Sequence, residues 1–174
     1  MPSAALERHP ATSCPALRGI KVSIVRKPES VQVAYALEGE IDRLRIPPPR
    51  PPRAAERLWQ HTCCEIFIAR EGLPGYREFN LSPSGEWAAY AFERYREGGR
   101  PLDVFPEIVL HHGAGFELIA SIPLDEPERL LIGLSAVIEE ESGALSYWAL
   151  RHPPGKPDFH HPDAFALELD EVRH

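Results

Sequence analysis

The chain has 174 residues, of which 43% are hydrophobic and 26% are charged, a composition typical of a globular domain and not of a disordered protein. Its net charge of -7 disfavours nucleic acid as a partner, and no apolar run is long enough to span a bilayer. We therefore expect one domain over residues 1–174 that binds neither nucleic acid nor a membrane.

Strand patterns begin after a segment that we interpret as an N-terminal extension, residues 1–17. Two alternating segments, 20–26 and 31–37, flank a turn-like tetrapeptide and predict a hairpin. The Pro-rich residues 46–58 follow, and their prolines favour a stiff extended loop between strands. Residues 54–60 are the one stretch whose pattern is compatible with a helical turn.

The next three predicted strands form a meander over residues 61–70, 77–81 and 86–92, with Gly/Pro-containing turns between them. Further strands are predicted at residues 107–111, 116–122, 130–139, 144–150 and 164–169. Roughly ten short strands separated by turn signals indicate an all-β protein, an antiparallel sandwich or barrel with little helix.

The strand at residues 61–70 has two different faces. Alternation places Ile66 on the core side, and it places His61 and Glu65 on a face that we expect to be at least partly open. His61 and Glu65 are four positions apart, or roughly 13 Å along a strand, so they cannot share one ligand atom.

The hairpin that follows has a predicted register. If its turn is centred on residues 71–74, Glu65 lies opposite Asn80, and Ile66 lies opposite Phe79. Glu78 then joins the open face, where carboxylates and a carboxamide beside aromatic rings suit a hydroxyl-rich ligand. The alternative is an ordinary solvated sheet face. The residues expected in the core are Val22, Ile24, Val33, Ile66, Ile68, Phe79, Leu118, Ile122, Ile132, Leu134 and Ile138.

A second concentration of polar side chains follows the strand at residues 144–150. Three prolines stiffen this loop, so we expect it to fold back on the open face and to form a wall of a binding site. The alternative is a loop with a purely structural role. For each tryptophan of the chain, the alternative to ligand binding is packing in the core or against a loop. The residues concerned are Trp148, His152, Lys156, Asp158, Phe159, His160 and His161.

Several kinds of chemistry have no support in the sequence. No GxSxG motif, Gly-rich phosphate loop or CxxC spacing occurs, so we predict no cofactor and no metal site. Cys14, Cys63 and Cys64 are odd in number and two are adjacent, which indicates reduced thiols. The N-terminal residues contain no apolar segment of the signal-peptide type, and we expect a cytoplasmic protein.

Three segments together resemble a known family: LWQHTCCEIFIA, YREFNLSPSGEWAAYAFERYR and SYWALRHPPGKPDFHHPDAF. They look like the motif blocks of small bacterial stand-alone DOMON-like proteins, relatives of the family 9 carbohydrate-binding modules. The resemblance implies a β-sandwich of jelly-roll type that binds a small ligand, a sugar or haem, and is usually not catalytic. The ligand-binding residues implied by the matched blocks are His61, Glu65, Glu78, Asn80, Trp87, Trp148, His152, Lys156, Asp158, His160 and His161.

Three functional classes stay open at this point. The leading hypothesis is a non-catalytic module that binds a small carbohydrate-like ligand; Met/His haem ligation is disfavoured because Met1 is the one methionine. The alternative is an enzyme, a hydrolase or isomerase, with Glu65 or Glu78 as general base and His152 or His161 as its acid partner. An interaction module that docks through the Pro-rich loop is the third class.

Overall fold

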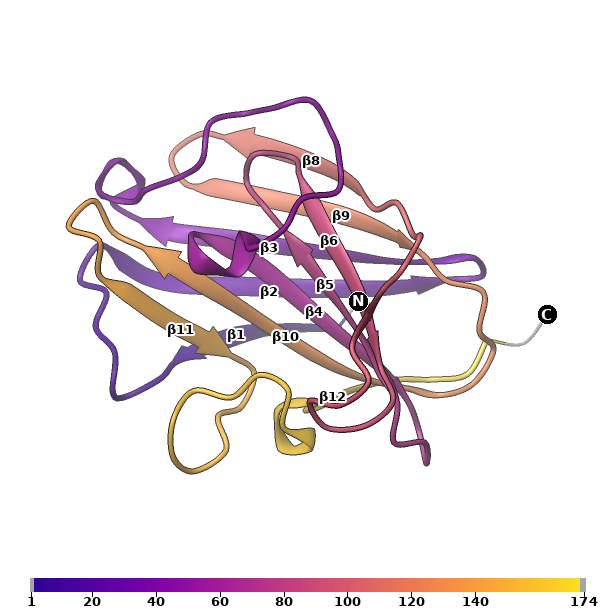
Figure 1. The fold of residues 1–174 in the computed structure, drawn as a ribbon. Helices are drawn as coiled ribbons and strands as arrows, with labels where there is room; N and C mark the ends of the chain where they lie inside the picture. Colours follow the sequence, from indigo (N-terminus) through magenta and orange to yellow (C-terminus); the bar gives the residue numbers. More distant parts are fainter. Residues whose placement is uncertain (1, 173–174) are drawn as a thin grey trace.

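Strands dominate the computed structural model, which describes residues 2–172 (Figure 1). Over this range there are twelve strands and three single-turn 3-10 helices, η1 to η3. In chain order they are β1 (Ser3–Arg8), β2 (Leu17–Lys27), β3 (Ser30–Gly39), η1 (Ile41–Arg43), η2 (Leu58–Gln60), β4 (Cys63–Arg70), β5 (Tyr76–Leu81), β6 (Trp87–Phe92), β7 (Arg100–Pro101), β8 (Glu107–His112), β9 (Phe116–Pro123), β10 (Leu130–Glu139), β11 (Leu145–Ala149), η3 (Pro162–Ala164) and β12 (Leu167–Leu169).

The strands form two antiparallel layers that share β1. One layer has the order β8-β9-β3-β2, and the other has the order β7-β6-β5-β4-β10-β11, with β12 added beside β10. Residues Ser3 to Leu6 of β1 pair with β2, whereas Glu7 and Arg8 pair with β11, so this strand passes from one layer to the other. The antiparallel β-sandwich predicted from the sequence is confirmed, and the strands of its two layers cross in Figure 1.

The predicted register of the β4–β5 hairpin is confirmed. Glu65 pairs with Asn80 and Ile66 pairs with Phe79, because only this register keeps the apolar pair inside and the polar pair outside. The β2–β3 hairpin is likewise present around residues 28 and 29. All residues expected in the core are at most 2% exposed.

A buried hydroxyl joins the two layers beneath the site strand. Tyr35 of β3 is fully buried, and its hydroxyl donates a hydrogen bond of 2.5 Å to the backbone carbonyl of Glu65 in β4. This bond links the two layers and gives the buried phenol the partner that it needs.

Removing this hydroxyl tests its contribution to stability. Tyr35→Phe is expected to lower the free energy of unfolding by about 1 kcal/mol, the usual net contribution of one hydrogen bond. Urea denaturation measures the loss, and Tyr147→Phe on the outer face of β11 is the matched control. Equal stability of Tyr35→Phe and the parent protein would show that the bond contributes nothing.

Some local expectations differ from the structure. Residues 1–17, interpreted as an extension, contain β1, which escapes notice because Leu6 is its only fully buried side chain. Between residues 54 and 60 only η2 is helical. The last strand begins at Leu167 and not at residue 164, because Pro162 starts η3. No helix within the described residues has the length and hydrophobicity needed to cross a membrane.

Candidate functional site

The outer face of the β4 layer, which points away from the other layer, carries the candidate site. The core takes Ile66 of β4 and Phe79 of β5, so alternation turns Glu65, Glu78 and Asn80 outward. The neighbouring strands add side chains in the same rows: Tyr90 of β6 lies beside Glu78, and Ser135 and Val137 of β10 and Tyr147 of β11 complete the surface.

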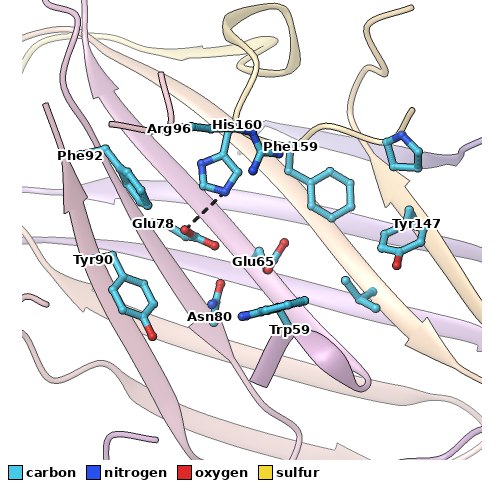
Figure 2. A pocket seen from close by; sticks show the side chains of 12 residues that line it. Trp59, Glu65, Glu78, Asn80, Tyr90, Phe92, Arg96, Tyr147, Phe159 and His160 are labelled. Carbon is cyan, nitrogen blue, oxygen red and sulfur yellow. Dashed lines mark ion pairs between the residues drawn. The ribbon is translucent and has the colours of Figure 1, made fainter. Parts of the chain in front are cut away.

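Loops close over this face and make a pocket of about 500 Å³ (Figure 2). The loop after β11 folds back across the sheet, as predicted, and contributes Phe159 and His160. Trp59 of η2 forms another wall, and Arg96 comes from the loop after β6. The complete lining is Trp59, Glu65, Glu78, Asn80, Tyr90, Phe92, Arg96, Val137, Tyr147, Pro157, Phe159 and His160.

Three hydrogen-bonded polar side chains form the floor of the pocket. With its amide nitrogen turned toward the carboxyl groups, Asn80 donates to Glu65 Oε1 and to Glu78 Oε1, each at 3.1 Å. The Ser135 hydroxyl donates to Glu65 Oε2 at 3.4 Å. These three side chains and that of Ser135 are all buried, so the face that was expected to be open is covered. The loop and the aromatic walls have removed it from bulk water.

Burial changes the protonation of both carboxyl groups. It raises the pKa of Glu65 well above the usual range, and the neighbouring charge of Glu78 raises it further. Burial also raises the pKa of Glu78, to about 7, although the hydrogen bond from Asn80 and the charge of Arg96 act in the opposite direction. Burial therefore disfavours the ionised form of both carboxyl groups, and Glu78 is close to its midpoint at neutral pH.

His160 connects the loop to this floor. Its Nδ1 lies 2.8 Å from the Tyr76 hydroxyl, which accepts a hydrogen bond from the backbone N–H of Arg96. The other ring nitrogen of His160, Nε2, lies 3.6 Å from Glu78 Oε2. Burial and the charge of Arg96 lower the pKa of His160 to about 4, so the ring is neutral at pH 7.

Asp158 anchors the loop after β11 through hydrogen bonds outside the pocket. It accepts a hydrogen bond from Arg96 Nη2 at 2.9 Å, another from the Tyr95 hydroxyl, and one from the backbone N–H of His160. Burial alone would raise the pKa of Asp158, but the hydrogen bonds from Tyr95 and Arg96 outweigh it and lower the pKa. Asp158 thus stays ionised and fixes both Arg96 and His160.

Of the residues singled out in the sequence, five line the pocket: Glu65, Glu78, Asn80, Phe159 and His160. Asp158 supports the wall without lining it. Trp148 and Trp87, expected at the ligand, do not line the pocket. Both are buried among the core residues between the layers, because alternation turns Trp148 inward and its neighbour Tyr147 outward.

The remaining sequence candidates lie outside the pocket. His61 is mostly exposed and lies 3.2 Å from Glu139, and Lys156 is exposed. His152 packs against His9, and its Nε2 lies 2.6 Å from the Glu7 carbonyl oxygen. His161 Nδ1 accepts a hydrogen bond from the Asp163 backbone and so caps η3. Trp148, Glu65 and His161 therefore do not line one common pocket.

Sequence reasoning missed most of the aromatic wall. Tyr90 and Phe92 could have been found by extending the predicted register from β5 to β6, and Tyr147 by pairing β10 with β11. Trp59 lies in the single turn η2 and Arg96 lies in a loop, and neither segment is long enough to carry a periodic signal. The described residues contain no group of three His, Cys, Asp or Glu side chains able to hold a metal ion.

Comparisons with known proteins bear on the fold alone. No family model and no curated protein matches the sequence. A candidate carbohydrate-binding protein from Bacteroides uniformis is similar in structure, with a TM-score of 0.56 and 14% identity over 91% of this chain and 84% of the other.

Two structures of a family 9 carbohydrate-binding module from Caldicellulosiruptor kristjanssonii are also similar. The complex with cellotriose has a TM-score of 0.56 and 13% identity over 97% of this chain and 83% of the other. The complex with glucose has a TM-score of 0.52 and 12% identity, over 87% and 75%. This protein therefore has the β-sandwich fold of such modules.

Proposed function

We propose that this protein is a binding module for a small carbohydrate and that it is not a catalyst. The observation that carries the proposal is the convergence of Glu65, Glu78 and Asn80 on the floor of a pocket with aromatic walls. Hydrogen-bonding side chains select the hydroxyl groups of a sugar, and flat rings cover its apolar C–H faces. The two structures bound to glucose and cellotriose, which share this fold, give further support.

The size and the stiffness of the pocket suit a small ligand. A volume of about 500 Å³ accommodates one or two sugar rings and lies within the usual range for ligand sites. Its floor is built on paired strands and its loop wall is held by Asp158, so little ordering is required upon binding. Three buried free cysteines fit a reducing compartment such as the cytoplasm, which we propose as the location.

A panel of monosaccharides and short oligosaccharides, read by thermal shift and then by calorimetry, tests this proposal. At least one sugar should raise the unfolding temperature and bind with one-to-one stoichiometry. If no sugar of the panel binds at millimolar concentration, carbohydrate binding is refuted.

Trp59 provides a mutational test of the same site. Its side chain is 51% exposed although it lines the pocket, so Trp59→Ala should weaken sugar binding by about tenfold or more with little loss of stability. Phe105→Ala is the matched control, because Phe105 is also an exposed aromatic residue and lies outside the pocket. Titration calorimetry measures both variants. Unchanged affinity of Trp59→Ala would place the ligand elsewhere.

An enzyme acting on a similar ligand is the second candidate. The observation in its favour is the pair of carboxyl groups whose pKa values are raised, as acid–base catalysis requires. The acid partners expected from the sequence, His152 and His161, lie outside the pocket, and only His160 could replace them. Turnover of a sugar that disappears in Glu65→Gln would favour the enzyme, whereas binding without turnover favours the module.

A further inference from the structure

The charges around the pocket are unbalanced. Two carboxyl groups, Glu65 and Glu78, lie side by side on its floor. Arg96 is the one Arg or Lys among the lining residues; its guanidinium is about half exposed and bonds to Asp158 at 2.9 Å. The positive charge of Arg96 is therefore already offset by Asp158, which belongs to the wall.

The imidazole beside Glu78 does not supply the missing charge. His160 lies 3.6 Å away, which is longer than a hydrogen bond, and its low pKa keeps the ring neutral at pH 7. Glu78 Oε1 receives the Asn80 amide, whereas Oε2 lies beside this distant imidazole and has no hydrogen bond among the described residues. Glu78 is nevertheless 94% buried, and a carboxylate so buried is costly without a cation or several donors.

We infer that the ligand carries a protonated amine among its hydroxyl groups, as an amino sugar with a free amino group does, and that the ammonium binds beside Glu78. This inference rests on the proposed carbohydrate-binding function and specifies its ligand class. The ammonium group supplies a positive charge and additional hydrogen-bond donors, and the floor of the pocket lacks both.

The walls of the pocket favour the same kind of group. Trp59, Tyr90, Phe92, Tyr147 and Phe159 surround the two carboxyl groups (Figure 2). Aromatic rings stabilise an organic cation through their electron-rich faces, most strongly when water is excluded. An acetylated amine has no charge and would leave the carboxyl pair without a cation. The pocket should therefore bind an amino sugar more tightly than its N-acetyl form.

Calorimetry with three matched monosaccharides tests the inference: glucosamine, N-acetylglucosamine and glucose. At pH 6.5 glucosamine should bind at least about tenfold more tightly than the other two, the effect of one charge-assisted hydrogen bond. Repeating the titration in buffers of different ionisation enthalpy should show proton release with glucosamine and none with glucose, since the ammonium stabilises the ionised carboxylates. The titratable and charged groups around the carboxyl pair, which share in this proton release, are Glu65, Glu78, Tyr76, Tyr90, Arg96, Asp158 and His160.

Glu78→Gln removes the charge and keeps the shape of the side chain. The variant should bind glucosamine and glucose within about twofold of each other, and Glu107→Gln, exposed on β8, should retain the full preference. Equal binding of the two sugars by the parent protein overturns the inference and leaves carbohydrate binding intact. Absence of binding by all three sugars counts against both. A preference that persists in Glu78→Gln also overturns the assignment to this carboxylate.

Discussion

Ile66→Ala is expected to lower the free energy of unfolding by about 2 to 5 kcal/mol, the usual cost of truncating a fully buried aliphatic side chain. Ile66 is 0% exposed and occupies the centre of the interlayer core, where β4 pairs it with Phe79 on one side and Leu134 on the other. Both neighbours belong to hydrogen-bonded strands, so the sheet cannot collapse to fill the cavity, and the loss should reach this range.

Urea denaturation followed by circular dichroism measures this loss. Leu73→Ala, in the exposed turn between β4 and β5, is the control and should change stability by less than about 0.5 kcal/mol. A loss in Ile66→Ala no larger than that of the control would contradict the packing of β4 against the opposite layer.

The second large effect concerns stability and pH at the floor of the pocket. In the folded protein the pKa of Glu78 is about 7, against an ordinary value of 4.5, so folding takes up a proton between these two values. Its contribution to stability is fully present below pH 4.5 and is lost as the pH rises through 7. The raised pKa of Glu65 likewise makes the folded protein less stable as the pH rises. His160 acts in the opposite direction: its contribution is present above pH 6.5 and is lost as the pH falls toward 4.

Glu78→Gln isolates one of these groups. The variant should match the parent protein at pH 4 and should be more stable by about 2 to 4 kcal/mol at pH 8, where the parent must bury an ionised Glu78. Denaturation at pH 4, 6 and 8 provides the test, with Glu107→Gln as the control. A difference that does not vary with pH would show that Glu78 has the same pKa in the folded and unfolded chains. The expected gain would mean that the binding site is maintained at a cost in stability.

The sheet part of the site could be predicted from the sequence because strands carry a period. Alternation and a Gly/Pro turn were enough to place Glu65 opposite Asn80 and to set Glu78 on the same face. Trp148, which the matched blocks imply as a ligand residue, faces the core, and its neighbour Tyr147 has the outward position. An aromatic residue near a polar loop does not reveal which face of its strand it occupies.

The loop parts were less predictable. Proline content predicted that the loop would fold back on the sheet, as it does, but it could not show which histidine would turn toward the sheet. The backbone of Arg96 adopts a left-handed conformation with φ of 53°, and no local pattern of the sequence indicates it. Contacts between loops far apart in the chain, such as Arg96 with Asp158, arise only when the strands have paired.

The division between a strand-built floor and loop-built walls has an evolutionary consequence. Glu65, Asn80 and Glu78 are carried by paired strands, so their backbone positions are set by the sheet itself. Trp59, Arg96 and Phe159 come from three separate connections between strands, and each can vary while the sandwich remains intact. Descendants of this chain could therefore acquire new ligand preferences by exchanging loop residues, while the carboxyl pair remains as an inherited anchor.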